Sequence, residues 1–183
     1  MNESHHVFTT DAGLQVRVRP LYPDDAPFLI DIFAHLGVES RYLRFHRAFS
    51  SLPTHQIVGE ATAIAQTTWR HGRGWLAFAD LPNEPDAAVG GVRWVRTHGD
   101  EAEIALTVRD DMQGQGIGRE LLRIAVEQAR ADGIHTLTAV VQANNRAIQR
   151  LLGASPWPVQ RSIHAGEMFI AVDLRGAESY ALA

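Results

Sequence analysis

Three glycines stand on alternate positions, at Gly114, Gly116 and Gly118, immediately before a stretch with helical spacing. They lie in the segment RDDMQGQGIGRELL, residues 109–122. Glycine disfavours a helix by about 1 kcal/mol relative to alanine, so three of them at a helix start need a specific reason. A helix start presents unpaired N–H groups and the positive end of the helix dipole, and glycine lets an anion approach the backbone closely. The segment therefore predicts a turn that binds a phosphate group.

Length and composition predict one globular domain spanning residues 1–183, with residues 1–12 and 177–183 as frayed tails. Of its 183 residues, 45% are hydrophobic and 21% are charged, which is enough to bury one core. The formal net charge of -4 argues against a dedicated nucleic-acid binder. The chain has no cysteine, which excludes disulfides, thiol catalysis and cysteine-bound zinc. A cytoplasmic location is the default expectation.

Neither a membrane span nor a secretion signal is expected. No uncharged apolar run is long enough to cross a bilayer, and the N-terminus lacks an apolar core flanked by basic residues. The adjacent histidines His5 and His6 are expected to belong to a solvated tail. No metal site is predicted.

Before the glycine-rich segment, the periodicity of apolar residues changes from helical to alternating. Short turn sequences such as LPNEPD and HGD separate the later alternating runs, and such short connections join antiparallel neighbours. A three-strand meander is therefore predicted. The expected elements are a strand at 14–18, helices at 23–36, 39–49 and 52–64, and strands at 74–80, 87–97 and 101–110.

After the glycine-rich segment, an apolar stripe predicts a helix that ends at Gly133, followed by a buried strand at 135–142. A strand, helix, strand crossover requires the two strands to be parallel. A short helix at 144–153, with Asn144 as candidate cap, and a hairpin turning at Ala165 and Gly166 complete the chain. The expected fold is an α/β domain whose mixed sheet is mostly antiparallel, with one parallel pair and helices on both faces.

Three phosphate-binding motifs compete for the glycine-rich turn. The dinucleotide fingerprint G-x-G-x-x-G fails on spacing, and the P-loop fails because no lysine follows. The remaining pattern, Q-x-x-G-x-G, is satisfied by Gln113, Gly116 and Gly118 between a strand and a helix. Here the chain resembles the GNAT acetyltransferase superfamily, whose members show this motif in this context.

The resemblance extends over most of the chain. The stretch VRVRPLYPDDAPFLIDIFAHLGVESRYLRF is similar to the opening of the acetyltransferase domain of Pat-type protein lysine acetyltransferases, and VRDDMQGQGIGRELL and ANNRAIQRLL resemble their later segments. The resemblance implies an N-acetyltransferase that uses acetyl-CoA and a primary amine, either a protein lysine or a small molecule. A non-catalytic sensor that binds acyl-CoA is the alternative of another class.

The resemblance also implies which residues hold the donor. Backbone groups of Leu106, Thr107 and Val108 would bind the pantetheine arm, and the N–H of Val108 would polarise the thioester carbonyl. Arg119 would add a cation to the turn, although a solvated first-turn charge is an equal alternative. Asn145 would contact the cofactor arm, although a helix cap is an alternative for it. The implied pyrophosphate cradle comprises Gln113, Gly114, Gln115, Gly116, Ile117, Gly118 and Arg119.

A substrate lysine has an ordinary pKa of about 10.4, so a base must take its proton near neutral pH. Glu101 and Glu103 sit two apart on one strand, so they share a face with Ala105 and Thr107. The resemblance places the base on this strand and favours Glu103. A solvated strand-end glutamate is the alternative.

One feature departs from the family pattern. Many members carry a tyrosine on the helix after the asparagine, which can protonate the leaving thiolate, but residues 146–153 contain none. A thiol has an ordinary pKa of about 8.5, so its thiolate can leave without an acid. Neither the acceptor nor the oligomeric state follows from the sequence.

Overall fold

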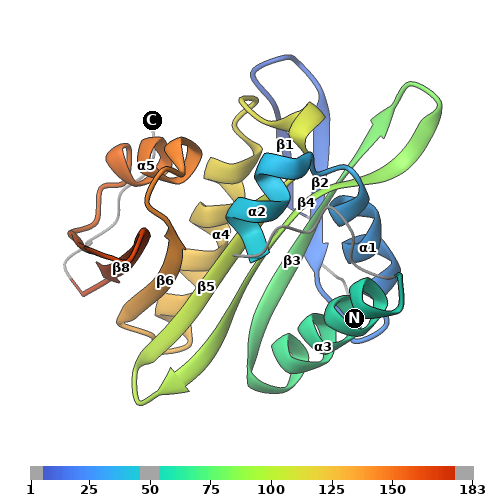
Figure 1. Cartoon of the computed structure of the whole chain (residues 1–183). Helices are drawn as coiled ribbons and strands as arrows, with labels where there is room; N and C mark the ends of the chain where they lie inside the picture. Colours follow the sequence, from blue (N-terminus) through green and yellow to red (C-terminus); the bar gives the residue numbers. More distant parts are fainter. Residues whose placement is uncertain (1–5, 46–53, 176–183) are drawn as a thin grey trace.

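The structure is a computed structural model that describes residues 6–45 and 54–175. Figure 1 shows one sheet running through the molecule with helices packed against it. The elements are β1 (His6–Thr9), β2 (Gln15–Pro20), α1 (Ala26–Ala34), α2 (Val38–Phe45), α3 (Thr54–His71), β3 (Gly72–Leu81), β4 (Glu84–His98), β5 (Glu101–Val108), the 3-10 turn η1 (Asp110–Met112), α4 (Ile117–Ala131), β6 (Thr136–Gln142), α5 (Arg146–Gly153), β7 (Val159–His164) and β8 (Glu167–Asp173).

Within the described ranges the sheet has the strand order β1-β2-β3-β4-β5-β6-β8-β7. Its pairs are antiparallel apart from β5 and β6, which are parallel because α4 connects them in a crossover. The meander of β3, β4 and β5 and the hairpin of β7 and β8 are present as predicted. Ala165 and Gly166 have φ values of 52° and 84°, as the tight hairpin turn requires. The predicted mixed sheet is confirmed.

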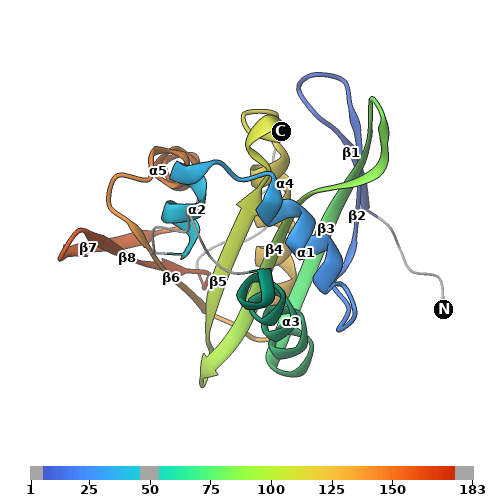
Figure 2. The ribbon, with the colours of Figure 1, turned by 45° about the vertical axis from the view of Figure 1, so that its right-hand side comes forward.

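Helices cover both faces of the sheet, and each face has its own apolar core. On one face Ile32 of α1 and Ala65 of α3 are buried against Leu76 of β3. On the other face Leu121 and Ala125 of α4 are buried in the larger core. Figure 2 shows α1 and α3 together in front of the strands, with α4 seen in part behind them. The predicted amphipathic helices therefore bury the stripes that their spacing indicated.

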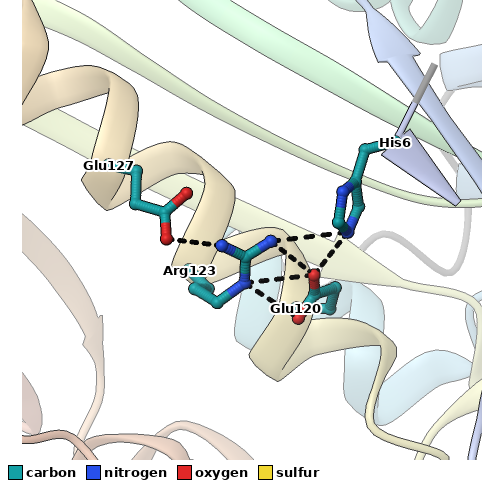
Figure 3. Close-up of polar contacts among 4 residues, drawn as sticks. All are labelled: His6, Glu120, Arg123 and Glu127. Atoms are coloured by element: carbon teal, nitrogen blue, oxygen red, sulfur yellow. Dashed lines mark hydrogen bonds and ion pairs between the residues drawn. The ribbon is translucent and has the colours of Figure 1, made fainter. Parts of the chain in front are cut away.

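The first strand corrects the expectation of a frayed segment at 1–12. Residues 6–9 form β1, which pairs antiparallel with β2, and Thr10 is buried where the two strands turn. The expectation that His6 is solvated tail is also wrong. Nε2 of His6 lies 2.5 Å from Oε1 of Glu120, which also accepts a hydrogen bond from Arg123 at 2.7 Å (Figure 3). A polar contact with α4 thus anchors β1. This strand has only four residues, too few for an alternating pattern of apolar residues to predict it. His5 and residues 177–183 lie outside the described residues.

Two helices differ from their predicted lengths. α3 runs to His71 rather than ending at residue 64, because Ala61, Ala65 and Thr68 continue one buried stripe. The residues between these positions are mostly polar, so the helical pattern was not recognised beyond residue 64. α2 ends at Phe45, and the remainder of the predicted 39–49 helix lies outside the described residues. No helix in the described residues is long and apolar enough to cross a membrane.

Replacing Glu120 with glutamine tests the contact between β1 and α4. Burial opposes ionisation of Glu120, but Arg123 and His6 outweigh it and hold the pKa of this carboxyl below its ordinary value of 4.5. The contact therefore stabilises the fold above about pH 4.5 and is lost as the pH falls through the lowered pKa. We expect Glu120→Gln to reduce the free energy of unfolding by about 1 kcal/mol at pH 7, lowering Tm by roughly 2–4 °C.

The control is Glu127→Gln, which removes a more exposed partner of Arg123 on the same helix (Figure 3). Its effect on Tm should be smaller. Thermal unfolding at pH 7 and pH 4 measures both variants. A Tm difference for Glu120→Gln that is as large at pH 4 as at pH 7 would contradict the electrostatic origin of the contact.

Candidate active site

The parallel pairing of β5 with β6 stops early. Only the first three residues of β5 pair with β6, ending at Glu103 opposite Thr138, although both strands continue. Toward the top of Figure 1 the two strands separate, while β5 stays paired with β4 throughout. The second half of β5 therefore has an edge that β6 does not cover.

The direction of the backbone groups along β5 follows from one hydrogen bond. The N–H of Arg109 donates to the carbonyl of Val89 at 3.0 Å, so odd-numbered residues face β4. Backbone groups alternate in an antiparallel strand, so those of Ile104, Leu106 and Val108 point into the gap. The backbone groups of Thr107 point toward β4. Its side chain lines a cleft on the face of the sheet that α1 and α3 cover. Of the three residues expected to contribute backbone groups, Leu106 and Val108 have them toward the gap.

The glycine-rich turn lies at the end of this gap, immediately before α4. Gly114 and Gly116 have φ values of 75° and 85°, which only glycine adopts without strain. Gly116 is the N-cap of α4, and Ile117 begins the helix and is buried in the core. A Cβ on Gly118 would lie 3.6 Å from a methyl carbon of Leu106, which is an ordinary van der Waals distance, so packing alone does not require glycine there. The predicted turn therefore exists, with a helix start behind it.

The remaining residues of the turn have different environments. The side chain of Gln113 donates to the carbonyl of Val108 at 3.2 Å and to Asp110 at 3.0 Å, tying the turn to the strand end. The carbonyl of Gln115 accepts from the N–H of Asp11 in the β1–β2 turn at 3.3 Å. Arg119 is exposed in the first turn of α4. An exposed cation is thus present near the turn.

Arg109 is a residue that the sequence interpretation missed. Its side chain is 3% exposed and donates to Glu84 and to Asp111, each at 2.9 Å. Burial opposes its charge, but these hydrogen bonds outweigh burial and keep the pKa of Arg109 above its ordinary value. Asp31, His35 and Glu84 place ligand-type atoms within 4.8 Å of one another here. Arg109 supplies the positive charge between the carboxylates of Asp31, Glu84 and Asp111.

Asp110 links the turn to the helices on the opposite side. Its Oδ2 accepts from the N–H of Gly37 at 2.9 Å, and its Oδ1 accepts from Gln113 at 3.0 Å. The N–H of Asp110 also donates to the carbonyl of His35 at 3.3 Å. The connection between α1 and α2 is therefore held against the glycine-rich turn.

A cleft lies on the face of β4 and β5 that α1 and α3 cover. Its walls include Phe33 from α1, Ile64 from α3 and Arg93 from β4, and its floor includes Ala105 and Thr107. Glu103 precedes Ala105 by two residues, so its side chain is on the same face, where it is exposed. Glu101 shares this face and pairs with His98 at 3.1 Å. The predicted face of Glu103, Ala105 and Thr107 therefore borders a cleft beside the end of the β5–β6 pairing.

Asn145 lies on the far side of the gap, at the start of α5. Its side chain accepts from the N–H of Ile148 at 3.1 Å, and the residue is 8% exposed. Asn145, and not Asn144, is therefore the helix cap, so the candidate cap at Asn144 was wrong. The strand-to-helix position places Asn145 after β6, opposite the uncovered edge of β5.

A family model described as an acetyltransferase (GNAT) domain matches residues 15–155. The chain belongs to this family of acetyl-CoA-dependent N-acetyltransferases, and the enzyme class suggested by the glycine-rich motif is confirmed. Among solved structures, the GNAT domain of S. lividans PAT has a TM-score of 0.77 at 24% identity, covering 92% of this chain and 96% of that one. The predicted resemblance to Pat-type domains is thus confirmed at the level of the fold.

Of two further relatives, one was solved with bound coenzyme A and the other has a named substrate. The PaiA N-acetyltransferase from Thermoplasma acidophilum, solved in complex with coenzyme A, has a TM-score of 0.64 at 17% identity over 86% of this chain and 98% of that one. An L-methionine sulfoximine/L-methionine sulfone acetyltransferase from Pseudomonas aeruginosa is 41% identical over 54 residues. That match spans 28% of this chain and 31% of the relative's length.

Replacing Arg109 with leucine tests whether this guanidinium fixes the end of β5. The change leaves Glu84 and Asp111 without their buried cation, so we expect the free energy of unfolding to fall by about 2–3 kcal/mol and Tm by roughly 5–10 °C. Arg175→Leu is the control, because Arg175 pairs with Asp173 on the exposed surface. Thermal unfolding measures both variants. Equal Tm values for the two would show that Arg109 has no special structural role.

Proposed function

We propose that this protein transfers the acetyl group of acetyl-CoA to a primary amine, using the gap between β5 and β6 for the donor and the cleft beside Glu103 for the acceptor. The observation that carries the proposal is the uncovered edge of β5 between the glycine-rich turn and Glu103. A donor lying along this edge would have its phosphates near the start of α4 and its thioester near the cleft. We also propose that residues 1–183 act as one domain in the cytoplasm.

The donor would be held mainly by backbone groups. The pyrophosphate would lie on the turn of residues 113–119, where the N–H groups at the start of α4 and the exposed Arg119 offer positive charge. The pantetheine amides would add hydrogen bonds along the free edge at Val108 and Leu106, as an extra strand does. Because the arm separates the pyrophosphate from the thioester, the N–H of Ile104, which is nearer Glu103, would polarise the thioester carbonyl in place of that of Val108. Asn145 would border the arm from the side of β6.

The acceptor would react on the face that carries Glu103. An amine must lose a proton to attack the carbonyl carbon, and Glu103 is placed to accept that proton directly or through water. A C–N bond then forms, the C–S bond breaks, and the electron pair leaves on sulfur as a thiolate. Solvent can supply the proton that this thiolate later takes up, because a thiol has an ordinary pKa of only about 8.5.

Two acceptor classes fit this reaction. A protein lysine is suggested by the similarity to the GNAT domain of S. lividans PAT. A small molecule is suggested by the Pseudomonas relative, whose named substrates carry an amine and a carboxylate on one carbon. A narrow, partly apolar cleft favours the small molecule, because α1 and α3 both wall it.

Gly116→Ala tests the donor site. Alanine at a φ of 85° is strained, so we expect the free energy of unfolding to fall by about 1 kcal/mol. The added methyl group should also lower the affinity for acetyl-CoA about tenfold, because it crowds the N–H groups at the start of α4. Calorimetric titration measures the affinity.

Gly99→Ala is the matched control for that variant. Gly99 also has a positive φ, at 53°, but it lies in the turn between β4 and β5, and nothing lies within 4 Å of an added Cβ. It should lose stability without losing affinity for acetyl-CoA. If Gly116→Ala binds acetyl-CoA as tightly as Gly99→Ala does, the turn is not the pyrophosphate site.

Glu103→Gln tests the catalytic base. We expect kcat to fall about a hundredfold, since general base catalysis contributes roughly 10²–10⁴. Affinity for acetyl-CoA should be unchanged, with saturating acetyl-CoA raising Tm by roughly 5–11 °C in both proteins. Glu101→Gln is the matched control on the same strand face and should retain its activity. Equal turnover in all three proteins would remove Glu103 from the mechanism, and no Tm shift with acetyl-CoA would remove the enzyme assignment.

A further inference from the structure

The cleft beside Glu103 holds a second charged residue that the reaction above does not use. Arg93 is on β4, directly opposite Ala105 of β5, and its side chain lines the cleft. Its side chain is half-buried among apolar residues that include Leu29 and Ile64. Arg93 therefore places a cation on the wall of an otherwise largely apolar cleft.

Among the residues that the structure describes, no carboxylate forms an ion pair with the guanidinium of Arg93. Its Nε atom is buried and has no hydrogen-bond partner in the structure. The carboxylates that influence it are Glu103 and Glu60, both exposed, and neither forms an ion pair with it in the described part of the chain. Burial outweighs both carboxylates and lowers the pKa of Arg93. Buried cations in proteins are otherwise paired, as Arg109 is in this chain.

The positions of Arg93 and Glu103 fix a spacing between two charges. Arg93 is opposite Ala105, which is two residues along β5 from Glu103, so the two charged residues are diagonal neighbours on one face. Diagonal neighbours on adjacent strands have Cβ atoms about 7–8 Å apart. A long arginine and a glutamate at that spacing can hold the two charged groups of a small zwitterion between them.

We propose that the acceptor is an α-amino acid with an apolar side chain, whose carboxylate binds Arg93 while its amine faces Glu103. This inference rests on the acetyltransfer reaction proposed above and names the acceptor class for that site. Arginine suits the role because its planar fork can bind a carboxylate through two hydrogen bonds. The apolar walls from α1 and α3 would receive the side chain of the amino acid.

The test compares L-leucine with L-leucinamide, which has the same amine and side chain but no carboxylate. Thiol release from acetyl-CoA measures kcat/KM for each. The amine of the amide loses its proton more readily, so without recognition of the carboxylate the amide would be the better acceptor. We expect wild-type kcat/KM for leucine to exceed that for leucinamide by about tenfold or more.

Variants at Arg93 locate the origin of that preference. Arg93→Gln should reduce kcat/KM for leucine about tenfold, mainly through KM, and leave leucinamide within about twofold. Arg93→Lys should recover part of the preference, because it restores a charge without the planar fork. Arg161→Gln is the control, since Arg161 is an exposed residue on β7. Tm and its shift with acetyl-CoA are measured for each variant, so misfolding is detected separately.

The rates with these amines decide whether the acceptor is an α-amino acid. A leucine preference that Arg93→Gln abolishes supports it. Equal rates with leucine and leucinamide, equal losses for both in Arg93→Gln, or acetylation of a lysine peptide without acetylation of leucine would overturn it and leave the acetyltransfer reaction intact. Failure to acetylate any of these amines, together with no Tm shift on adding acetyl-CoA, would overturn both.

Discussion

The early end of the pairing between β5 and β6 is the constraint on which the candidate site depends. A strand edge presents N–H and C=O groups that need partners, and a buried group without one costs about 1–3 kcal/mol. β6 separates from β5 after Thr138, while its other edge is paired with β8 along its whole length. The uncovered half of β5 thus lies between a glycine-rich turn at one end and two carboxylates at the other. Backbone groups of β5 beyond Glu103 therefore have no strand partner on the side of β6.

The alternation of β5 separates the two tasks of the site. Side chains of Ile104, Leu106 and Val108 pack into the core beneath α4. The side chains of Ala105 and Thr107 face the cleft instead. Backbone groups at the even positions point toward the gap, so one strand can hold a donor by its backbone and face an acceptor with its side chains. The small side chain of Ala105 leaves the space between Glu103 and Arg93 open.

Local patterns in the sequence predicted the parts of the fold that have strong local causes. Glycines at positive φ, the stripe of α4 and the alternation of β5 each leave a signal within a few residues. β1 gave no such signal, because its stability comes from β2 and from Glu120, more than a hundred residues away. Arg93 and Arg109 look alike in the sequence, as arginines within or just after strands. Their difference lies in their partners: Arg109 donates to Glu84 and Asp111, whereas Nε of Arg93 has no hydrogen-bond partner in the described part of the chain.

The cap of α5 shows the same limit at a finer scale. Asn144 and Asn145 are adjacent and have the same side chain, so the sequence alone does not tell which one caps the helix. In the structure it is Asn145. The face of the sheet that carries Glu103 could be predicted from alternation alone. The walls of the cleft could not, since no local pattern indicates that α1 and α3 pack over β4 and β5 and place Phe33 and Ile64 there.

The double hydrogen bond of Asp110 has a thermodynamic consequence. One carboxylate joins the connection between α1 and α2 to the side chain of Gln113, so the wall on one side of the sheet and the turn at its end share a single restraint. A ligand that stiffens either element also removes freedom from the other. Linkage makes this effect reciprocal: whatever one ligand gains from the presence of the second, the second gains equally from the first. Asp110 thereby provides a physical basis for cooperativity between the two substrates of a transferase without any rearrangement of the sheet.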